Sequence, residues 1–355
     1  MLVAAFVTAL GWSIVQRREG ATPAASTALT GYIALDVEPF FKDERVVNIL
    51  AEQRLAVKVT RIGSRDMAAR VAAGIDFFMP SGVVAANQIS DAARHAGIVA
   101  TQSSPFHTPM VIASWSPIAR ILVANGIAQP SGERVYTVDM GKLAETMLAG
   151  KRWKDLRTAR DYDVSRSVLV STTDLRRSNS AALYLALVSQ AVHGTLATDR
   201  AEARAQAARV APLFTRQGYQ ESYVNGNFDD YLSIGIGKTP LAFIYENQIV
   251  HYALAKSAVR DDMVLLYPRP TIVNKVVLVA TSERAKALAE LLSGDARLQR
   301  IGVEYGFRVA DASAFTASVK SSGLAIEERL THVVDPPAFE IMSEMIEAVA
   351  AEMSR

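Results

Sequence analysis

The chain has 355 residues, of which 50% are hydrophobic and 21% are charged, and its formal net charge is +2. This length exceeds what one hydrophobic core usually serves, so we expect two domains. The small net charge, without a basic run interleaved with aromatic residues, argues against a nucleic-acid partner. The absence of cysteine excludes disulfides, thiolate metal sites, a cysteine nucleophile and a lipid-modified N-terminal cysteine.

The N-terminus is apolar over residues 2–15 and is followed by Arg17 and Arg18. This run fits the core of a signal peptide better than a full membrane span, which needs about 20 residues. The small residues that follow are typical of a tether between an export signal and a folded domain. A signal should carry its positive charges before the apolar run, however, whereas these two arginines follow it. Either the true start lies upstream of Met1 or the segment is an unusual anchor. We predict a signal or membrane-anchor segment at 1–18 and a tether at 19–30; a buried N-terminal helix is the less favoured alternative.

The next stretch alternates between strand-like and helix-like patterns. We expect a strand and turn at 31–41, helices at 43–55, 67–74 and 83–97, and strands at 57–62 and 75–79. This alternation predicts a largely parallel sheet with helices on both faces. Ligands of such sheets bind outside the carboxyl ends of the strands. Ser64 and Ser81 both lie at such ends, each directly before an expected helix.

The rest of the chain continues this pattern less regularly. Residues 102–109 are predicted as a loop, 110–115 as a strand and 117–126 as a helix with proline in its first turn. From there to about residue 262 the chain is predicted to be helix-rich, with strands at 167–171 and 241–245. Further predicted elements are a strand at 276–280, helices at 282–293 and 295–305, and an amphipathic helix at 336–353.

The strand at 167–171 leads through a polar turn into a long apolar helix. Ser178, Asn179 and Ser180 stand where this helix would begin. Their side-chain oxygens can cap free backbone N–H groups, which is the simpler interpretation. They can equally leave those groups, with the positive end of the helix dipole, directed at a ligand. The recurrence of the same strand, polar turn and helix pattern earlier in the chain favours the ligand-binding interpretation.

The sequence contains no complete motif for catalysis, metal binding or nucleotide binding. Gly237-Lys238-Thr239 lacks the upstream glycine of a phosphate-binding loop, and Asp161-Tyr162-Asp163 lacks the rest of a calcium loop. The five histidines are scattered, and no nucleophile elbow or prepared pair of carboxylates is present. We therefore predict no catalytic residue, no metal site and no cofactor. An enzyme on the same plan would need such a group and is the third-ranked alternative.

Several short stretches, taken in order and spacing, resemble the extracytoplasmic solute-binding proteins of the two-lobed, periplasmic-binding type II architecture, particularly the molybdate-binding branch. Together they span residues 31–308. They are Ile-Gly-Ser at 62–64 with Met-Ala at 67–68 and Gly-Ile-Asp at 74–76, Ser-Trp at 114–115 closing a Pro-Met-Val-Ile strand, Thr-Asp at 173–174 with Ser-Asn-Ser at 178–180, Ala-Phe-Ile-Tyr-Glu at 242–246, Leu-Tyr-Pro at 266–268, and Gln-Arg-Ile with Tyr-Gly-Phe-Arg between 299 and 308.

The resemblance implies an α/β fold of two Rossmann-like lobes joined by two crossover strands. It implies lobe one at 31–116 and 265–335, lobe two at 117–264 and a C-terminal helix at 336–355. In this family the ligand is held in the cleft and the lobes close over it. By resemblance, Ser64 supplies a hydroxyl and a helix N–H group from lobe one, the 178–180 turn supplies those of lobe two, and Tyr245 reaches the ligand. We add Ser81 because of its strand-end position.

One position departs from the family. Its first strand usually ends in a serine-bearing turn, whereas this chain has Asp36 there. An unpaired carboxylate in a partly dry cleft disfavours an oxyanion ligand. Arg65 could neutralise Asp36, could clamp a carboxylate-bearing ligand with two hydrogen bonds, or could simply face solvent. Molybdate is thus disfavoured, and a small polar organic solute stays open.

The resemblance implies a function in transport. We predict a non-catalytic, monomeric, periplasmic or extracytoplasmic protein, tethered to the membrane, that delivers a small polar or anionic solute to an ABC-type transporter. Its partners would be the solute and a membrane permease or other membrane protein. The alternative is a membrane-anchored sensor or assembly module with the same fold and a degenerate cleft.

Overall fold

The computed structural model describes residues 28–218, 220, 225–256 and 259–354. The predicted signal or anchor segment at 1–18 lies outside the described residues, as does the tether up to residue 27. The first strand already begins at Leu29, inside the range predicted as tether. Among the helices in the described ranges, none is both long and apolar enough to cross a membrane.

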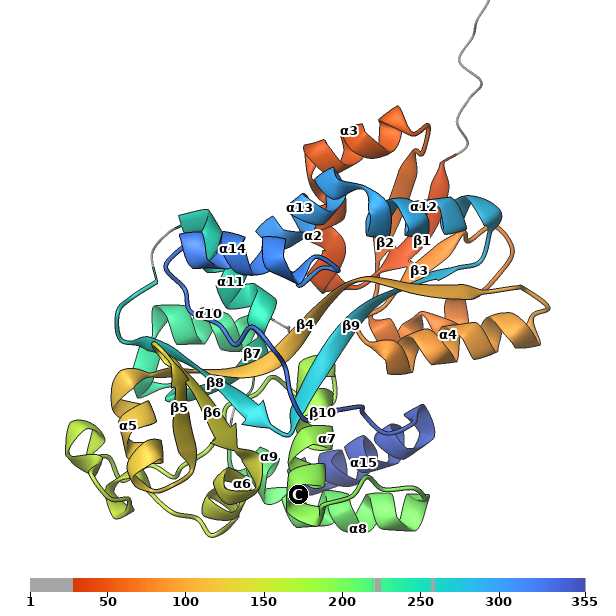
Figure 1. Cartoon of the computed structure of the whole chain (residues 1–355). Coiled ribbons are helices and arrows are strands. Elements are labelled where there is room, and N and C mark those ends of the chain that lie inside the picture. The colour runs from red at the N-terminus through yellow and green to blue at the C-terminus, as the bar shows by residue number, and fades with distance from the viewer. Residues whose placement is uncertain (1–27, 219, 221–224, 257–258, 355) are drawn as a thin grey trace, which may run out of the picture.

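Strands and helices alternate through much of the chain (Figure 1). The strands are β1 Leu29–Ile33, β2 Val57–Arg61, β3 Phe77–Met79, β4 Thr101–Trp115, β5 Ala128–Gly132, β6 Val135–Asp139, β7 Leu241–Tyr245, β8 Met263–Arg269, β9 Thr271–Ala280 and β10 Val333–Val334. The α-helices are α2 Glu38–Lys42, α3 Glu44–Glu52, α4 Val83–His95, α5 Ser116–Ala124, α6 Met140–Leu148, α7 Asn179–His193, α8 Arg200–Val210, α9 Pro212–Thr215, α10 Gly226–Ser233, α11 Glu246–Lys256, α12 Glu283–Gly294, α13 Ala296–Glu304, α14 Ala312–Ser321 and α15 Phe339–Met353.

Lobe one is built on the strands β2, β1, β3, β9 and β4, in that spatial order. β1 lies parallel to both β2 and β3, whereas β9 lies antiparallel to β3 and β4. α4 packs against β3 and β9, and α12 packs against β4 and β9 (Figure 1). β3 is buried throughout, as expected for a strand covered by helices.

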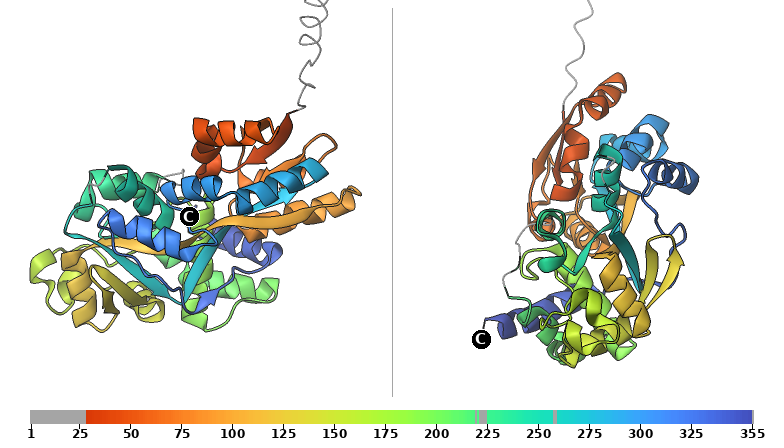
Figure 2. Two further views of the ribbon diagram at one scale, coloured as in Figure 1. Left: turned by 45° about the horizontal axis from the view of Figure 1, so that its top comes forward. Right: turned by 90° about the vertical axis from the view of Figure 1, so that its left-hand side faces the viewer.

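Lobe two is built on the second half of β4 together with β7, β8, β6 and β5. β4 and β9 lie antiparallel to each other and extend from this lobe into lobe one, so they are the two crossover strands (Figures 1 and 2). The predicted fold class, two α/β lobes joined by two crossover strands, is confirmed. α7 is buried from Ser180 to Ser189 because α6, α8, α15 and β7 surround it.

The predicted loop at 102–109 is wrong, because these residues belong to the 15-residue strand β4. Two prolines in this range favoured a loop. Pro105, however, lies in the bulge between Ser103 and Phe106, where the strand register shifts. A bulge is one of the few places in a sheet that tolerates proline.

The predicted helix at 67–74 is also wrong. The structure has two three-residue 3-10 helices instead, η2 Ser64–Asp66 and η3 Ala68–Arg70. Met67 is fully buried, but Ala68 and Val71 are only partly buried, and this leaves too little buried apolar surface to hold a helix of two turns.

The strand predicted at 167–171 is only an extended segment, in which Ser171 forms an isolated bridge with Ala242.

The chain passes between the lobes a third time after α13. Arg134 Nη2 of lobe two donates to Gly323 O at 2.7 Å, and Thr271 N donates to His332 O at 2.9 Å. α15 then packs against α7, α8 and α9 of lobe two and touches α4 of lobe one (Figure 1).

The domain boundaries drawn from the sequence stay predictions. One of them, at 264/265, falls inside β8, and this strand pairs with β4 and β6 of lobe two.

A buried ion pair ties this third passage to lobe two. Arg308 follows α13, and its Nε and Nη2 donate to the two carboxylate oxygens of Glu246, the first residue of α11, at 2.6 and 2.8 Å. The Tyr267 hydroxyl donates to the same carboxylate. Glu246 is fully buried and Arg308 is 6% exposed. The two charged side chains are therefore both held away from water.

Candidate functional site

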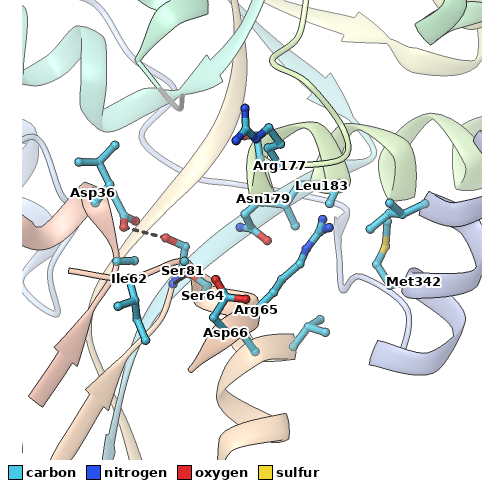
Figure 3. Close-up of a pocket in the computed structure, with 18 of the residues that line it drawn as sticks. Asp36, Ile62, Ser64, Arg65, Asp66, Ser81, Arg177, Asn179, Leu183 and Met342 are labelled. Carbon is cyan, nitrogen blue, oxygen red and sulfur yellow. Dashed lines mark hydrogen bonds between the residues drawn. The ribbon is translucent and has the colours of Figure 1, made fainter. Parts of the chain in front are cut away.

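A cleft of about 950 Å³ lies between the lobes. Lobe one contributes Asp36, Ser64, Arg65 and Ser81 to its lining (Figure 3). Lobe two contributes Ser178, Asn179 and Tyr245. Seven of the eight site residues predicted from the sequence are thus brought together in one cavity.

Ser180, the eighth, is not part of the lining. Its side chain is buried, and its Oγ lies 2.8 Å from both Thr173 Oγ1 and Ser178 Oγ. Ser180 therefore holds the turn before α7 from behind, and its hydroxyl is not available to a ligand in the cleft.

Three residues of lobe one are joined by two hydrogen bonds, one from the backbone of Ser81 and one from its side chain. Ser81 N donates to Ser64 Oγ at 3.0 Å, and Ser81 Oγ donates to Asp36 Oδ1 at 2.7 Å (Figure 3). These residues come from the ends of β1, β2 and β3, which lie side by side. The strand-end argument correctly pointed to this edge of the sheet. The expectation that Ser64 starts an α-helix is wrong, because η2 is a three-residue 3-10 helix.

The true helix start of lobe one is that of α4, directly after Ser81. Its N-cap residue is Gly82, with φ at 92°, and no side chain caps the first turn. A Cβ atom added at Gly82 would lie 3.2 Å from Asn274 Oδ1 and 3.5 Å from Asn179 Nδ2. The backbone conformation therefore favours glycine, and a Cβ atom there would also crowd Asn274. The N-terminus of α4 thus comes within contact distance of the N-terminus of α7.

The helix start of lobe two also lacks a side-chain cap. Ser178 is the N-cap residue of α7, but its hydroxyl is engaged with Ser180 and makes no capping hydrogen bond. Plain capping by Ser178 is therefore wrong. Asn179 Nδ2 donates to the Tyr245 hydroxyl at 3.3 Å, which fixes both side chains in the cleft. The first-turn N–H groups of α7 lack a side-chain acceptor, as is typical of a helix end that binds an anion.

Burial changes the protonation chemistry of two of these groups. Removal of water from the Asp36 carboxyl raises its pKa, and the hydrogen bond from Ser81 only partly opposes this change. Burial also raises the pKa of Tyr245, and the nearby charge of Asp36 adds to the effect. Tyr245 is therefore a neutral hydroxyl, and Asp36 accepts a proton more readily than an exposed aspartate does.

Four arginines line the cleft, and they are not equivalent. Arg61 Nη1 donates to Glu38 at 3.0 Å, and Arg176 Nη2 donates to Asp174 at 2.7 Å, so both charges are paired. Arg65 and Arg177 form no ion pair within the described residues. These two guanidinium groups are the free positive charges of the cleft, whose lining also contains Asp36 and Asp66.

Arg65 reaches across the cleft from lobe one to lobe two (Figure 3). Its Nη1 donates to Arg176 O at 3.4 Å, which is the single hydrogen bond of this guanidinium that the described part of the chain provides. The side chain as a whole is exposed, but desolvation by the surrounding walls lowers the pKa of Arg65, and the charge of Asp66 opposes this change. An anionic ligand would supply the missing counter-charge.

The C-terminal helix α15 forms one wall of the cleft. Phe339, Met342 and Ile346 line it from successive turns of this helix. The amphipathic pattern at 336–353 predicts this helix but not its role, because an apolar face has the same pattern whether it packs on a core or lines a cavity. The pairing partners of Arg61 and Arg176 were missed for a similar reason, since sequence spacing does not show which charges meet in space.

The described residues contain no group of three or more histidine, aspartate or glutamate side chains that could hold a metal ion. The cleft itself carries two carboxylates, of which Asp36 is already engaged by Ser81. Its donor groups are instead hydroxyls, amides, guanidinium groups and helix N–H groups. This set is suited to the recognition of an anion or a polar solute.

No protein-family model and no curated protein sequence matches the chain. Solved structures do match it over 92% of its length. The sulfate-binding protein SubI of Mycobacterium tuberculosis H37Rv matches at 15% identity over 99% of its own chain, with a TM-score of 0.53. An ABC transporter protein of Clostridium perfringens ATCC 13124 matches at 13% identity over 99% of its chain, with a TM-score of 0.55.

A protein described as a two-component system protein that mediates signal transduction matches equally well, at 13% identity over 99% of its chain with a TM-score of 0.53. Likeness at these identities establishes the fold. The chain therefore has the two-lobed type II architecture of the periplasmic solute-binding proteins, as its sequence stretches suggested. The narrower likeness to the molybdate-binding branch stays a prediction.

Proposed function

We propose that the chain is a non-catalytic, extracytoplasmic solute-binding protein that captures a small polar or anionic solute between its lobes and delivers it to an ABC-type transporter. One observation carries the proposal. Two helix N-termini from opposite lobes, those of α4 and α7, lack side-chain caps and meet at one cleft that also holds the unpaired charge of Arg65. Both features favour a negatively charged ligand group between them.

A ligand in this position acts on the whole molecule. It would contact Ser81 and α4 on one side and Asn179 and α7 on the other. A ligand that touches both lobes stabilises the closed state by the difference between its affinities for the closed and open states. This coupling is what a transport protein needs, because the transporter can then distinguish loaded from empty molecules.

The fold supports this role, since similar structures include a sulfate-binding protein and an ABC transporter protein. The wider setting belongs to the same proposal. We place the protein in the periplasm or an equivalent extracytoplasmic space, tethered by its N-terminal segment, as a monomer whose partner is a membrane permease. Its cleft would bind its solute without catalysis or a cofactor.

Thermal unfolding of the full chain with added anions tests the proposal. Sulfate, phosphate, acetate and glutamate are each added in turn, and a true ligand at 100 times its Kd stabilises the folded state by about 2.7 kcal/mol. The midpoint should then rise by several degrees with at least one anion. The Arg65→Gln variant should lose this rise, whereas Arg70→Gln, an exposed arginine that does not line the cleft, should keep it. A flat response across the panel would count against solute capture.

A second candidate function keeps the fold and changes the role. The similarity to a two-component system protein favours a membrane-anchored sensor or assembly module, and Asp36 in the cleft is consistent with a degenerate site. Neighbouring genes for a permease and an ATPase would favour transport. A neighbouring histidine kinase gene, with ligand binding intact, would favour the sensor.

A further inference from the structure

The cleft has a polar side and an apolar side, and the apolar side is formed largely by α15. We infer that its ligand is an organic anion with an apolar body, hydrocarbon or aromatic, rather than an inorganic oxyanion. The inference rests on the proposed function and names the class of solute that the same site would take.

The size of the cleft supports an organic ligand. Its volume of about 950 Å³ lies at the upper end of the roughly 300–1,000 Å³ found for pockets that hold drug-sized ligands. A sulfate or molybdate ion has five heavy atoms and would fill a small part of it. The rest would stay hydrated, and the apolar wall would gain nothing from the binding of such an ion.

The apolar side is lined by residues of two helices. Phe339, Met342 and Ile346 of α15 face the cavity together with Ala182 and Leu183 of α7. Figure 3 shows Leu183 and Met342 on the side opposite Asp36 and Ser81, with the Arg65 side chain between the two groups. Apolar side chains that line a cavity favour a ligand surface that also avoids water.

The polar side suits a carboxylate or a similar anionic group. Arg65 extends into the space between the two sides and forms no salt bridge within the described residues, although the charge of the neighbouring Asp66 acts on it. Residues at the N-termini of α4 and α7 line the same cleft. Asp36 stands at the far end of the polar side, where Ser81 holds its carboxyl. The anionic group would therefore bind Arg65 while its apolar body extends toward α15.

α15 is well anchored for this task. Its Glu344 accepts a hydrogen bond from Arg204 Nε of α8, and Met345 and Val349 are buried against lobe two. The same helix touches α4 of lobe one. The wall that it forms is therefore a fixed part of the cleft and not a loose C-terminal extension.

Calorimetric titration of the full chain tests the inference. The probes are acetate, butanoate, hexanoate and octanoate, with benzoate as an aromatic acid and with sulfate and phosphate as inorganic anions. Each buried methylene should tighten the Kd by about fourfold, so octanoate should bind far more tightly than acetate and sulfate. A series with equal affinities, or binding of sulfate or phosphate alone, overturns the inference and leaves the proposed function standing. If none of the probes binds, the result contradicts both the inference and the proposed function.

Variants of α15 locate the apolar side. Phe339→Ala removes a half-buried ring from the wall and should weaken octanoate binding about tenfold while leaving acetate binding unchanged. Glu340→Ala, at the neighbouring exposed position, should change neither. Met342→Ala provides a second test from the next turn, with chemical unfolding to verify that each variant is folded. An equal loss of acetate and octanoate affinity in Phe339→Ala would contradict the assignment.

Discussion

Asp36 is the charged residue that the cleft accommodates least easily. Burial raises the pKa of its carboxyl above the ordinary value of 3.8, so the folded protein binds this proton more tightly than the unfolded chain does. The stability that the proton provides is fully present below pH 3.8 and is lost as the pH rises through the raised pKa. Ionised Asp36 therefore destabilises the folded state.

The Asp36→Asn variant should consequently be more stable than the wild type at pH 8, and the difference should shrink toward pH 4. Asparagine keeps an oxygen that can accept the hydrogen bond from Ser81 but never ionises. Urea unfolding at the two pH values measures the change. Asp66→Asn replaces a second aspartate of the cleft lining and serves as the control. A difference that grows as the pH falls would contradict the assigned direction.

Gly306 is a position where the backbone allows no side chain. Its φ is +80°, and an added Cβ would lie 2.2 Å from Asn247 O. Gly306→Ala should therefore cost about 1 kcal/mol for the conformation and about 1–3 kcal/mol more for the displaced backbone. Gly323 has a φ of +76° with open space around it, so Gly323→Ala should show only the conformational cost of about 1 kcal/mol. Urea unfolding of the two variants separates these effects, and equal losses would contradict the close contact.

Most of the individual polar residues of the cleft could be predicted from the sequence. Ser64 and Ser81 were found because parallel strands end at a common edge, and a pattern of strand followed by turn marks those ends. Asp36 was found because it stands where the resembling family has a serine-bearing turn. Ser180 was placed in the cleft wrongly, because a three-residue turn does not show which hydroxyl faces inward. Phe339 and Met342 could not be found, since nothing in an amphipathic pattern distinguishes a core face from a cavity face.

Among the elements, the junction between α11 and the segment after α13 depends on one buried charge pair. Removing Glu246 would leave Arg308 buried and uncompensated. Glu246→Ala should therefore destabilise the protein by about 3–5 kcal/mol. Chemical unfolding measures this loss.

An exposed pair provides the matched comparison. Arg120 Nη2 lies 2.7 Å from Asp161 Oδ2, with the two side chains 59% and 52% exposed. Asp161→Ala should change the free energy of unfolding by less than about 1 kcal/mol. A similar loss in both variants would show that burial does not set the strength of the Glu246 pair.

The sequence predicted elements well where the apolar pattern was long and clearly bounded. α4, α12, α13 and α15 begin within three residues of their predicted starts, because caps such as Ser282 and Asp295 mark the helix ends. The hairpin of β5 and β6 was not predicted. β5 carries the sequence Ala-Gln-Pro-Ser-Gly, with one buried residue, so it has no alternating pattern to recognise.

For the whole molecule, the proposed function requires the lobes to move when solute binds. The chain contains no cysteine, so Lys58→Cys on β2 and Arg209→Cys on α8 would provide two unique sites for a donor and an acceptor dye. Both positions are exposed, one in each lobe. Saturating octanoate should raise the energy-transfer efficiency in this variant, because closure brings the lobes together. The Arg65→Gln background should abolish the change, and a change that persists there would contradict ligand-driven closure.

The path of β9 has a consequence for how the chain acquires its structure. β9 lies between β3 and β4 in the sheet of lobe one, and Phe77 pairs with Ala280. Until residue 280 has been synthesised, β3 and β4 expose unpaired edges, whereas most of lobe two can already form from contiguous chain. Pairings between such distant positions slow the folding of a domain. The sheet of lobe one should therefore form after most of lobe two, and the ligand cleft cannot exist before that sheet and α15 are both in place.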